Sequence, residues 1–242
     1  MSCIIEPEVM SSMSLSHEDY LEGSKSILRD SQNEKEKYYV KILDKRFVVY
    51  PNVFSPKYFK DSEFFYKELT VREGEVFLEI GPGTGIISVL AALKGASRVV
   101  AVDINEDAVE NTKENARING VGDKVEVFQG DVYGSLPDDV KFDTIFWNVP
   151  FGHTNDEGLT ALEKSIQDPA YRSIRKFVFE AKKHLKSEGR LVIGFSTTLG
   201  KFDVLRDFLK EAGFDVKMLA EVDSVEVHPA KFEIFEAVFP SS

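Results

Sequence analysis

Continuous apolar runs alternate with charged, helix-like segments through most of this chain of 242 residues. Apolar runs of this kind are typical of strands that are buried on both faces of a sheet, and the spacing between them suits amphipathic helices. The alternation therefore predicts an α/β fold with a mostly parallel sheet and helices on both of its faces. The expected strands are 77–80, 98–103, 125–132, 142–147, 191–195, 216–222 and 232–239, and the expected helices include 105–119, 171–186 and 202–211.

The part of the chain that precedes this alternation divides in two. Residues 1 to about 35 are rich in Ser, Glu and Asp and have little periodicity, so we expect a segment that is flexible or partly helical. Segments 38–43 and 46–50 alternate and carry β-branched and aromatic residues, which predicts a hairpin. A helix over 61–69 follows two prolines that break the pattern.

The first core strand ends in a glycine-rich turn that follows Glu79, and its glycines are Gly81, Gly83 and Gly85. Glycine lets main-chain amides approach a ligand closely. A dinucleotide site requires the frame G-x-G-x-x-G, but here the third glycine comes one residue early and Ile86 stands in its place. Pro82 also removes one of the amides that an anion nest would use, so the turn suits a zwitterionic amino-acid tail better than a pyrophosphate. S-adenosylmethionine has such a tail. An ordinary strand-to-helix turn, with Glu79 as a polar strand end, is the alternative.

Two further acids stand at the carboxyl ends of expected strands, where ligands of doubly wound sheets bind. Asp103 ends the second strand and is placed to accept both hydroxyls of a ribose. Asp131 follows the third strand and is placed to receive the exocyclic amine of adenine, with Ile104 or Val132 against the ring. The alternative for both acids is helix capping, which is common for Asp. Because three strand ends carry suitable residues at the same edge of the sheet, a ligand site is favoured over helix capping.

These elements, in this order, resemble the class I S-adenosylmethionine-dependent methyltransferases from about residue 76 to residue 239. Within that superfamily, Asn148-Val149-Pro150-Phe151 resembles the N-P-P-[YF] tetrapeptide of the methyltransferase small-domain group. This group includes rRNA guanine-N2 enzymes, adenine-N6 enzymes and release-factor glutamine methyltransferases. The resemblance implies a Rossmann-like seven-stranded sheet with an antiparallel last strand, and it implies S-adenosyl-L-methionine as the cofactor.

The resemblance also suggests how the chain is organised. We expect a flexible N-terminal segment at 1–35, a hairpin and helix extension at 36–70, and the methyltransferase domain at 71–242. In the resembling group such an extension lies over the cofactor or helps to bind the substrate, and a flap that only covers an edge strand is an equal alternative. Residues 152–169 are expected to be a mobile insertion beside the acceptor pocket, where substrate selectivity would reside.

The tetrapeptide suits the methylation of a planar nitrogen, whose lone pair is delocalised into its π system. The Asn148 side chain and the carbonyl of Val149 would each accept one N–H of an NH2 group, and Phe151 would stack on the flat substrate. Fixed acceptors also stabilise the positive charge that develops on the nitrogen, so no general base is required. The expected catalytic residues are Asn148, Pro150 and Phe151, and the expected cofactor contacts are Glu79, Gly81, Gly83, Gly85, Asp103, Ile104, Asp131, Val132 and Asn148.

Val149 is a departure from the group, which usually has a second proline at this position. The carbonyl acceptor survives the change, but the ring that fixes φ is lost, so we expect a less rigid loop and an altered substrate preference. The alternative for Asn148 and Phe151 is a turn asparagine and a core aromatic, and 19 Phe residues make a chance Phe easy to find.

Composition and charge limit the expected class of acceptor, the cellular location and the kind of site. The net charge of −11 gives no bulk attraction to RNA, so a protein or small-molecule acceptor gains weight, although a partner subunit could supply positive surface. The single cysteine and the absence of a long apolar run favour a cytoplasmic protein without a membrane span. The four histidines lack metal-ligand spacing, so no structural metal is expected.

Three hypotheses about function follow from the sequence. The favoured one is a methyltransferase that acts on a planar nitrogen, namely a glutamine amide, a nucleobase exocyclic amine or a similar group. The second is a methyltransferase for a small molecule, acting at another atom, with Val149 as the sign of a changed pocket. The third is a noncatalytic relative that binds cofactor, which the intact glycines and Asp103 argue against.

Overall fold

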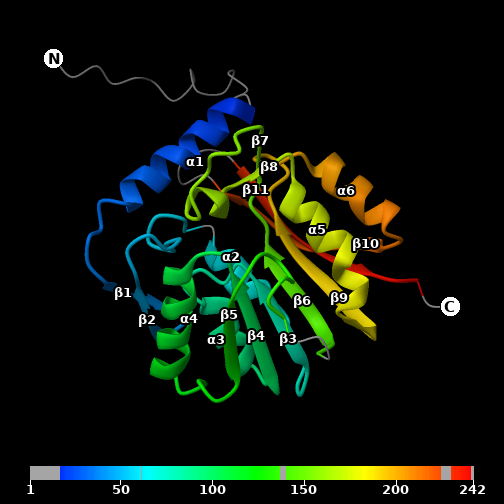
Figure 1. Ribbon diagram of the computed structural model, residues 1–242, viewed down its shortest axis with the longest axis horizontal. Coiled ribbons are helices and arrows are strands. Elements are labelled where there is room, and N and C mark those ends of the chain that lie inside the picture. The colour runs from blue at the N-terminus through cyan, green and yellow to red at the C-terminus, as the bar shows by residue number, and fades with distance from the viewer. Residues whose placement is uncertain (1–16, 61, 137–139, 225–229, 241–242) are drawn as a thin grey trace.

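A seven-stranded sheet runs through the middle of the molecule, with helices on both of its faces (Figure 1). The computed structural model describes residues 17–60, 62–136, 140–224 and 230–240. Its helices are α1 (His17–Ser31), α2 (Ser62–Glu68), α3 (Ile86–Leu93), α4 (Glu106–Ile118), α5 (Arg172–Glu180) and α6 (Phe202–Glu211), with short 3-10 turns η2 (Glu163–Ser165) and η3 (Ala181–Lys183). Its strands are β1 (Tyr38–Ile42), β2 (Lys45–Val49), β3 (Val76–Ile80), β4 (Arg98–Asp103), β5 (Val125–Gln129), β6 (Phe142–Asn148), β7 (Gly152–Thr154), β8 (Gln167–Pro169), β9 (Leu185–Phe195), β10 (Asp215–Ser224) and β11 (Ala230–Val238).

The strand order in the main sheet is β10-β11-β9-β6-β3-β4-β5. The five strands β5, β4, β3, β6 and β9 are parallel to one another, and β11 lies antiparallel between β9 and β10. The expectation of a Rossmann-like seven-stranded sheet with an antiparallel last strand is therefore confirmed. The parallel strands end at the same edge, so their carboxyl ends bring Ile80, Asp103 and Asn148 to one side of the sheet.

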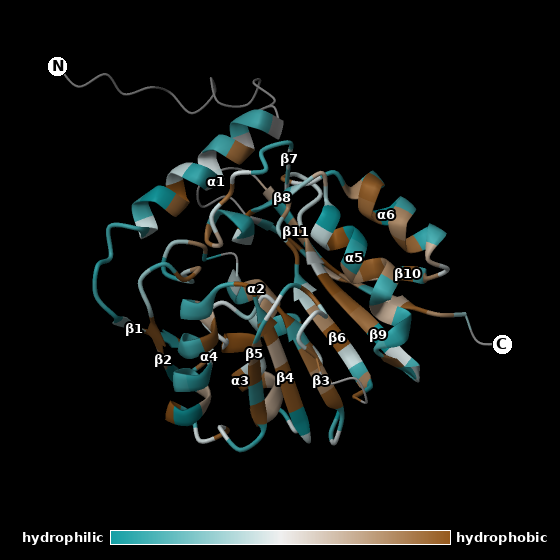
Figure 2. Cartoon of the chain, viewed as in Figure 1, coloured by the Kyte–Doolittle hydropathy of each residue, from teal (hydrophilic) through white to brown (hydrophobic). Residues whose placement is uncertain are grey.

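Two hydrophobic clusters cover the two faces of the sheet, and the strands between them are largely apolar (Figure 2). One cluster joins the sheet to α5 and α6 through residues such as Phe177 and Leu205. The other joins it to α2 and α3 through residues such as Phe65 and Val89. Burial on both faces explains why the strands read as continuous apolar runs in the sequence.

The boundary between α5 and β9 differs from the expectation. A single helix over 171–186 was expected, but α5 ends at Glu180, a 3-10 turn follows, and β9 already begins at Leu185. The first residues of β9 are mostly exposed and pair with β6 near Phe142, beside a register irregularity. Pairing with β6 makes the polar residues 186–188 part of β9. Because these residues do not form an apolar run, the start of β9 could not be recognised from the sequence.

The N-terminal part is packed on the core. Residues 17–31 form α1, so this stretch of the segment expected to be flexible or partly helical is helical, while residues 1–16 lie outside the described part of the chain. The hairpin of β1 and β2 has the expected strands, and it turns at Leu43 and Asp44, whose φ values of 45° and 64° suit a tight hairpin turn. Phe47 of β2 is fully buried in the same cluster as Phe77 of β3.

Residues 152–169, expected to be a mobile insertion, contain the short parallel pair of β7 and β8 together with η2. The segment packs against α1, because Leu162 and Ile166 share a small hydrophobic cluster with Leu28 and Phe59. Three parts of the chain that are far apart in sequence therefore meet above the carboxyl edge of the sheet.

Candidate active site at the carboxyl edge of the sheet

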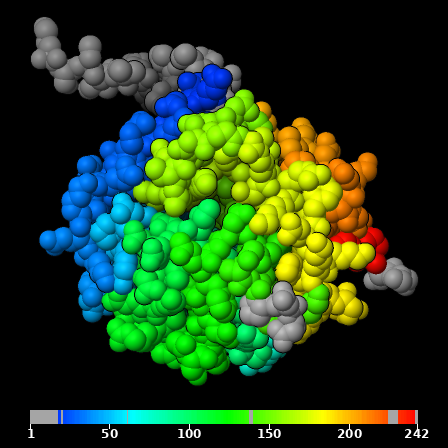
Figure 3. All heavy atoms as spheres, viewed as in Figure 1, coloured from blue at the N-terminus to red at the C-terminus, as the bar shows by residue number. Residues whose placement is uncertain are grey.

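A cavity of about 150 Å³ opens at the carboxyl ends of the central strands. The glycine turn after β3, the ends of β4 and β6, and the residues that follow β5 form its walls. Parts of α2 and of the segment 161–167 line it as well. In Figure 3 the face of the molecule is hollowed between the yellow-green residues of the upper part and the green residues below them.

The glycine turn is shaped so that side chains are excluded from it. Gly81, Gly83 and Gly85 have φ values of 61°, 55° and 74°, which L side chains rarely adopt. A Cβ on Gly81 would lie 2.9 Å from Nε1 of Trp147, and a Cβ on Gly85 would lie 2.8 Å from the Cα of Thr112. The backbone conformation favours glycine at all three positions, and close approach also requires it at Gly81 and Gly85, so the three glycines are a built feature and not a chance cluster.

Glu79 is buried beside the turn, with 3% of its surface exposed. Burial raises the pKa of its carboxyl to about 8, while a hydrogen bond from the Ser88 hydroxyl opposes the rise and the nearby Asp103 carboxylate adds to it. A buried carboxyl of this kind gains most from a cationic partner, because the partner stabilises the ionised form. The site is therefore chemically suited to an ammonium group.

Asp103 ends β4 and is almost fully buried. One of its carboxylate oxygens accepts the N–H of Gly83 at 3.0 Å, and the other accepts the N–H of Asn105 at 2.9 Å. Burial raises the pKa of Asp103, and these backbone hydrogen bonds work against the rise. These two hydrogen bonds fix the carboxylate, and Asp103 lines the cavity.

Asp131, Val132 and Ile104 also line the cavity. The Asp131 side chain is 54% exposed and forms an ion pair of 2.8 Å with Lys176. Val132 is buried and has φ of 55°, a strained value for a β-branched residue that the tight turn after β5 imposes. Ile104 is 41% exposed, which leaves its apolar side chain free to pack on a flat ligand.

Asn148 ends β6, and its Oδ1 is buried without a hydrogen-bond partner among the described residues. Its neighbour across the sheet is Gly194 of β9. Val149 donates its N–H to the carbonyl of Gly194 at 3.2 Å, a bond that proline cannot make. This hydrogen bond attaches the loop to the sheet at the position where the group usually has a proline ring, and the lower rigidity of the loop stays a prediction.

Phe151 lies differently from the position expected for a stacking residue. Its ring packs 5.8 Å from that of Phe195 and 5.9 Å from that of Phe232, and the residue is not among those that line the cavity. Its carbonyl accepts the hydroxyl of Tyr171. The core-aromatic interpretation describes this ring better, whereas Pro150 does line the cavity.

Several cavity residues were missed by the sequence analysis. Ser62 at the start of α2 is 2% exposed, and its Oγ lacks a hydrogen-bond partner in the described part of the chain. Phe65 and Tyr66, which follow Ser62 in α2, also line the cavity. Lys164 of η2 and Gln167 of β8 line it as well. Lys164 and Gln167 lie in the segment 152–169, which the sequence placed beside the acceptor pocket without singling out either residue, and no local pattern marks Ser62, Phe65 or Tyr66.

Within residues 17–60, 62–136, 140–224 and 230–240, no group of three or more His, Cys, Asp or Glu side chains is arranged to hold a metal ion. None of the helices in these same ranges has both the length and the apolarity needed to cross a bilayer.

Comparison with known proteins adds evidence of descent. The family model described as the methyltransferase small domain matches residues 44–221. A putative protein N5-glutamine methyltransferase of Methanocaldococcus jannaschii is 33% identical over 178 residues, which are 72% of this chain and 87% of that protein. The release factor glutamine methyltransferase of Aquifex aeolicus is 31% identical over 157 residues, but these span only 54% of its length and 60% of this chain.

Solved structures give the same fold at lower identity. Trm5 of Methanocaldococcus jannaschii, solved in complex with adenosine, superposes with a TM-score of 0.61 at 20% identity. The match covers 86% of this chain and 58% of that one. At this identity the likeness is evidence for the fold alone.

Proposed function

This chain belongs to the methyltransferase small-domain family and is an S-adenosylmethionine-dependent methyltransferase, and we propose that its acceptor is the planar side-chain amide of a glutamine in a protein. The observation that carries the proposal is the buried Oδ1 of Asn148, which has no hydrogen-bond partner among the described residues and belongs to a cavity-lining side chain. An unpaired buried acceptor is costly, so its retention favours a substrate that donates an N–H to it.

The residues around the cavity fit the proposed cofactor. Glu79 would bind the ammonium of its amino-acid part, and Asp103 would accept the ribose hydroxyls. Asp131, Val132 and Ile104 would surround the adenine, and the bare backbone at Gly81 and Gly83, which line the cavity, would leave room for the part of the cofactor between them. Gly85 does not line the cavity, and its lack of a side chain makes room for Thr112 of α4. When bound, S-adenosylmethionine supplies a methyl group on a sulfonium sulfur, which is electrophilic without help from a metal.

The protein would then have to hold the nitrogen of the acceptor amide in position for the methyl group. Asn148 Oδ1 would accept one N–H of the acceptor amide, and the carbonyl of Val149 would accept the other, which holds the nitrogen in line with the methyl group. These fixed acceptors also stabilise the positive charge that grows on the nitrogen during transfer. Phe151 is proposed to support this loop from the core, since its ring packs on Phe195 and Phe232.

The favoured acceptor class rests on two observations. The relative from Methanocaldococcus jannaschii, matched over most of its length, bears the name of a putative protein N5-glutamine methyltransferase. The net charge of −11 also disfavours a bare polyanion as the partner. A nucleobase amine has the same planar geometry, so RNA is the outcome that the experiment must be able to detect.

The experiment is transfer of labelled methyl groups from S-adenosylmethionine into separate protein, RNA and small-molecule fractions of a lysate. Wild type is compared with Asn148→Ala and with Asn33→Ala, a control that removes an exposed asparagine far from the cavity lining. We expect label in protein, located on a glutamine by mass spectrometry, and a loss of about 100-fold in Asn148→Ala. Label in RNA would overturn the proposed acceptor, and unchanged turnover in Asn148→Ala would overturn the role of that residue.

A further inference from the structure

Three of the six buried residues of α4 are polar, although an amphipathic helix normally buries apolar side chains. Asn111, Thr112 and Asn115 each have 0% of their surface exposed. Burying polar side chains is unfavourable unless they are hydrogen-bonded, so the partners of these three show what the helix is built to hold.

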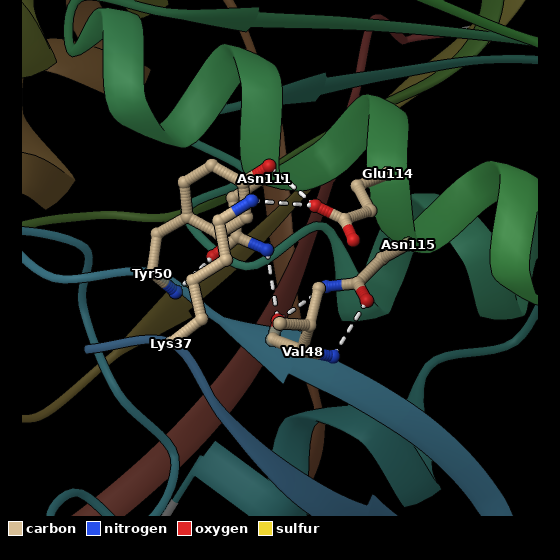
Figure 4. Close-up of polar contacts among 6 residues, drawn as sticks. All are labelled: Lys37, Val48, Tyr50, Asn111, Glu114 and Asn115. Carbon is tan, nitrogen blue, oxygen red and sulfur yellow. Dashed lines mark hydrogen bonds and ion pairs between the residues drawn. The ribbon is translucent and has the colours of Figure 1, made fainter.

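Asn111 and Asn115 both bind the free edge of β2 (Figure 4). Asn115 accepts the N–H of Val48 at 2.8 Å and donates to its carbonyl at 2.7 Å, as a neighbouring strand would. Asn111 accepts the N–H of Tyr50 at 2.9 Å and donates to the carbonyl of Val48 at 2.8 Å. The two carboxamides, one helical turn apart, therefore attach the hairpin to the core.

Asn115 also makes a bond that Asn111 does not make. Its Nδ2 donates to the carbonyl of Thr84, inside the glycine turn, at 2.8 Å. The hydroxyl of Thr112 donates to the carbonyl of Gly83, in the same turn, at 3.2 Å. Because a trans peptide places its N–H opposite its C=O, these two bonds direct the N–H groups of Thr84 and Gly85 away from α4. The N–H of Gly85 donates to the carbonyl of Pro82 at 2.8 Å and so closes the turn.

We propose that Asn115 and Thr112 are positioning residues for the cofactor, because they fix the peptide planes of the glycine turn from behind. This inference rests on the proposed use of S-adenosylmethionine at that turn. Gly83 and Thr84 line the cavity, whereas Asn111, Thr112 and Asn115 do not, so they act through the turn and not by contact. The same carboxamide of Asn115 links the hairpin to the turn, so the hairpin contributes to the shape of the site without touching the ligand.

The test is the affinity for S-adenosylhomocysteine, the demethylated cofactor, measured by isothermal titration calorimetry on the full chain. The variants are Asn115→Ala, Thr112→Val and Asn111→Ala. Asn111→Ala is the matched control, because it removes two buried hydrogen bonds to β2 and none to the turn. Thr112→Val keeps the shape of the side chain and removes only its hydroxyl, so it tests the turn even where Asn115→Ala is poorly folded.

We expect the dissociation constant to rise at least tenfold in Asn115→Ala and about threefold to tenfold in Thr112→Val, with little change in Asn111→Ala, although Asn111→Ala is also less stable to urea. In turnover assays the KM for the cofactor should rise while kcat at saturating cofactor is retained, which a loss of folded protein would not produce. Equal affinities in wild type and Thr112→Val, or an equal loss in Asn111→Ala and Asn115→Ala, would overturn the positioning role. Absence of binding by the wild-type protein would overturn the proposed function as well.

Discussion

Gly194 and Asn148 are neighbours across the sheet, and a Cβ on Gly194 would lie 2.6 Å from Oδ1 of Asn148. The same Cβ would also lie 2.8 Å from Cε1 of Phe65. No positive φ requires glycine here, so the reason for this glycine is the space that the side chains of Asn148 and Phe65 occupy.

Gly194→Ala should therefore displace Asn148 or Phe65 and lower methyl transfer about tenfold or more, because misplacement by a few tenths of an ångström is sufficient to disturb alignment. Gly122→Ala is the control, since its Cβ would meet the nearest atom at 3.6 Å, an ordinary contact. Steady-state turnover measures the effect. Equal activity of the two variants would show that Asn148 does not depend on the space at Gly194.

Glu79 gives a prediction about pH. The folded pKa of about 8 lies above the ordinary value of 4.5, so between these values the folded, cofactor-free protein holds a proton that the unfolded chain has released. The stability contributed by this group therefore falls as pH rises from 4.5 to 8, by up to about 1.4 kcal/mol per pH unit. Glu79→Gln cannot release a proton and should lack this slope.

Urea unfolding of wild type and Glu79→Gln at about pH 5.5 and about pH 7.5 measures the effect, and the drop in unfolding free energy should be roughly 2–3 kcal/mol larger in wild type. Asp103 and the other carboxyl groups are common to both proteins, so the difference between the two slopes reports Glu79. Parallel pH profiles would mean that Glu79 is already ionised in the free protein.

Tyr171 holds the end of the tetrapeptide in place. Its buried hydroxyl donates to the carbonyl of Phe151 and accepts the N–H of Lys201 at 2.9 Å. Tyr171→Phe leaves both groups unpaired, so we expect about 1–3 kcal/mol lower stability and a lower kcat, with cofactor affinity retained. Tyr133→Phe is the matched control, because its buried hydroxyl donates to the Phe177 carbonyl, away from the tetrapeptide.

Chemical denaturation and turnover assays on both tyrosine variants separate the two effects. Both should lose stability, and only Tyr171→Phe should turn over more slowly at saturating cofactor. A kcat for Tyr171→Phe equal to that of Tyr133→Phe would reduce the role of Tyr171 to folding alone.

Much of the site followed from the chain itself because its residues stand in short segments with a fixed local geometry. The strand ends at Glu79, Asp103 and Asn148 were predicted from continuous apolar runs, and parallel pairing alone brings them to one edge. The glycine spacing separated two cofactor classes without knowledge of the fold. The family and the sheet topology that these patterns implied are confirmed.

Other features depend on contacts between segments that are far apart in the sequence. The Phe151 ring faces the core because it packs on Phe195 and Phe232. The place of Ser62 on the cavity wall and the close approach of Gly194 to Asn148 appear only where α2 and β9 approach the end of β6. The buried asparagines of α4 belong to the same group, because a helical pattern assigns polar residues to the solvent side.

The sequence by itself determined the order of strands and helices, the shape of the glycine turn and the placement of acids at strand ends. These properties depend on side-chain size, charge and backbone freedom over a few residues. The tertiary structure decided which polar groups were left without partners in the cavity, which aromatic ring faced the core, and which amide held the glycine turn from behind. Such properties arise from packing across the sheet, where the neighbour of each residue is set by the fold and not by its position in the chain.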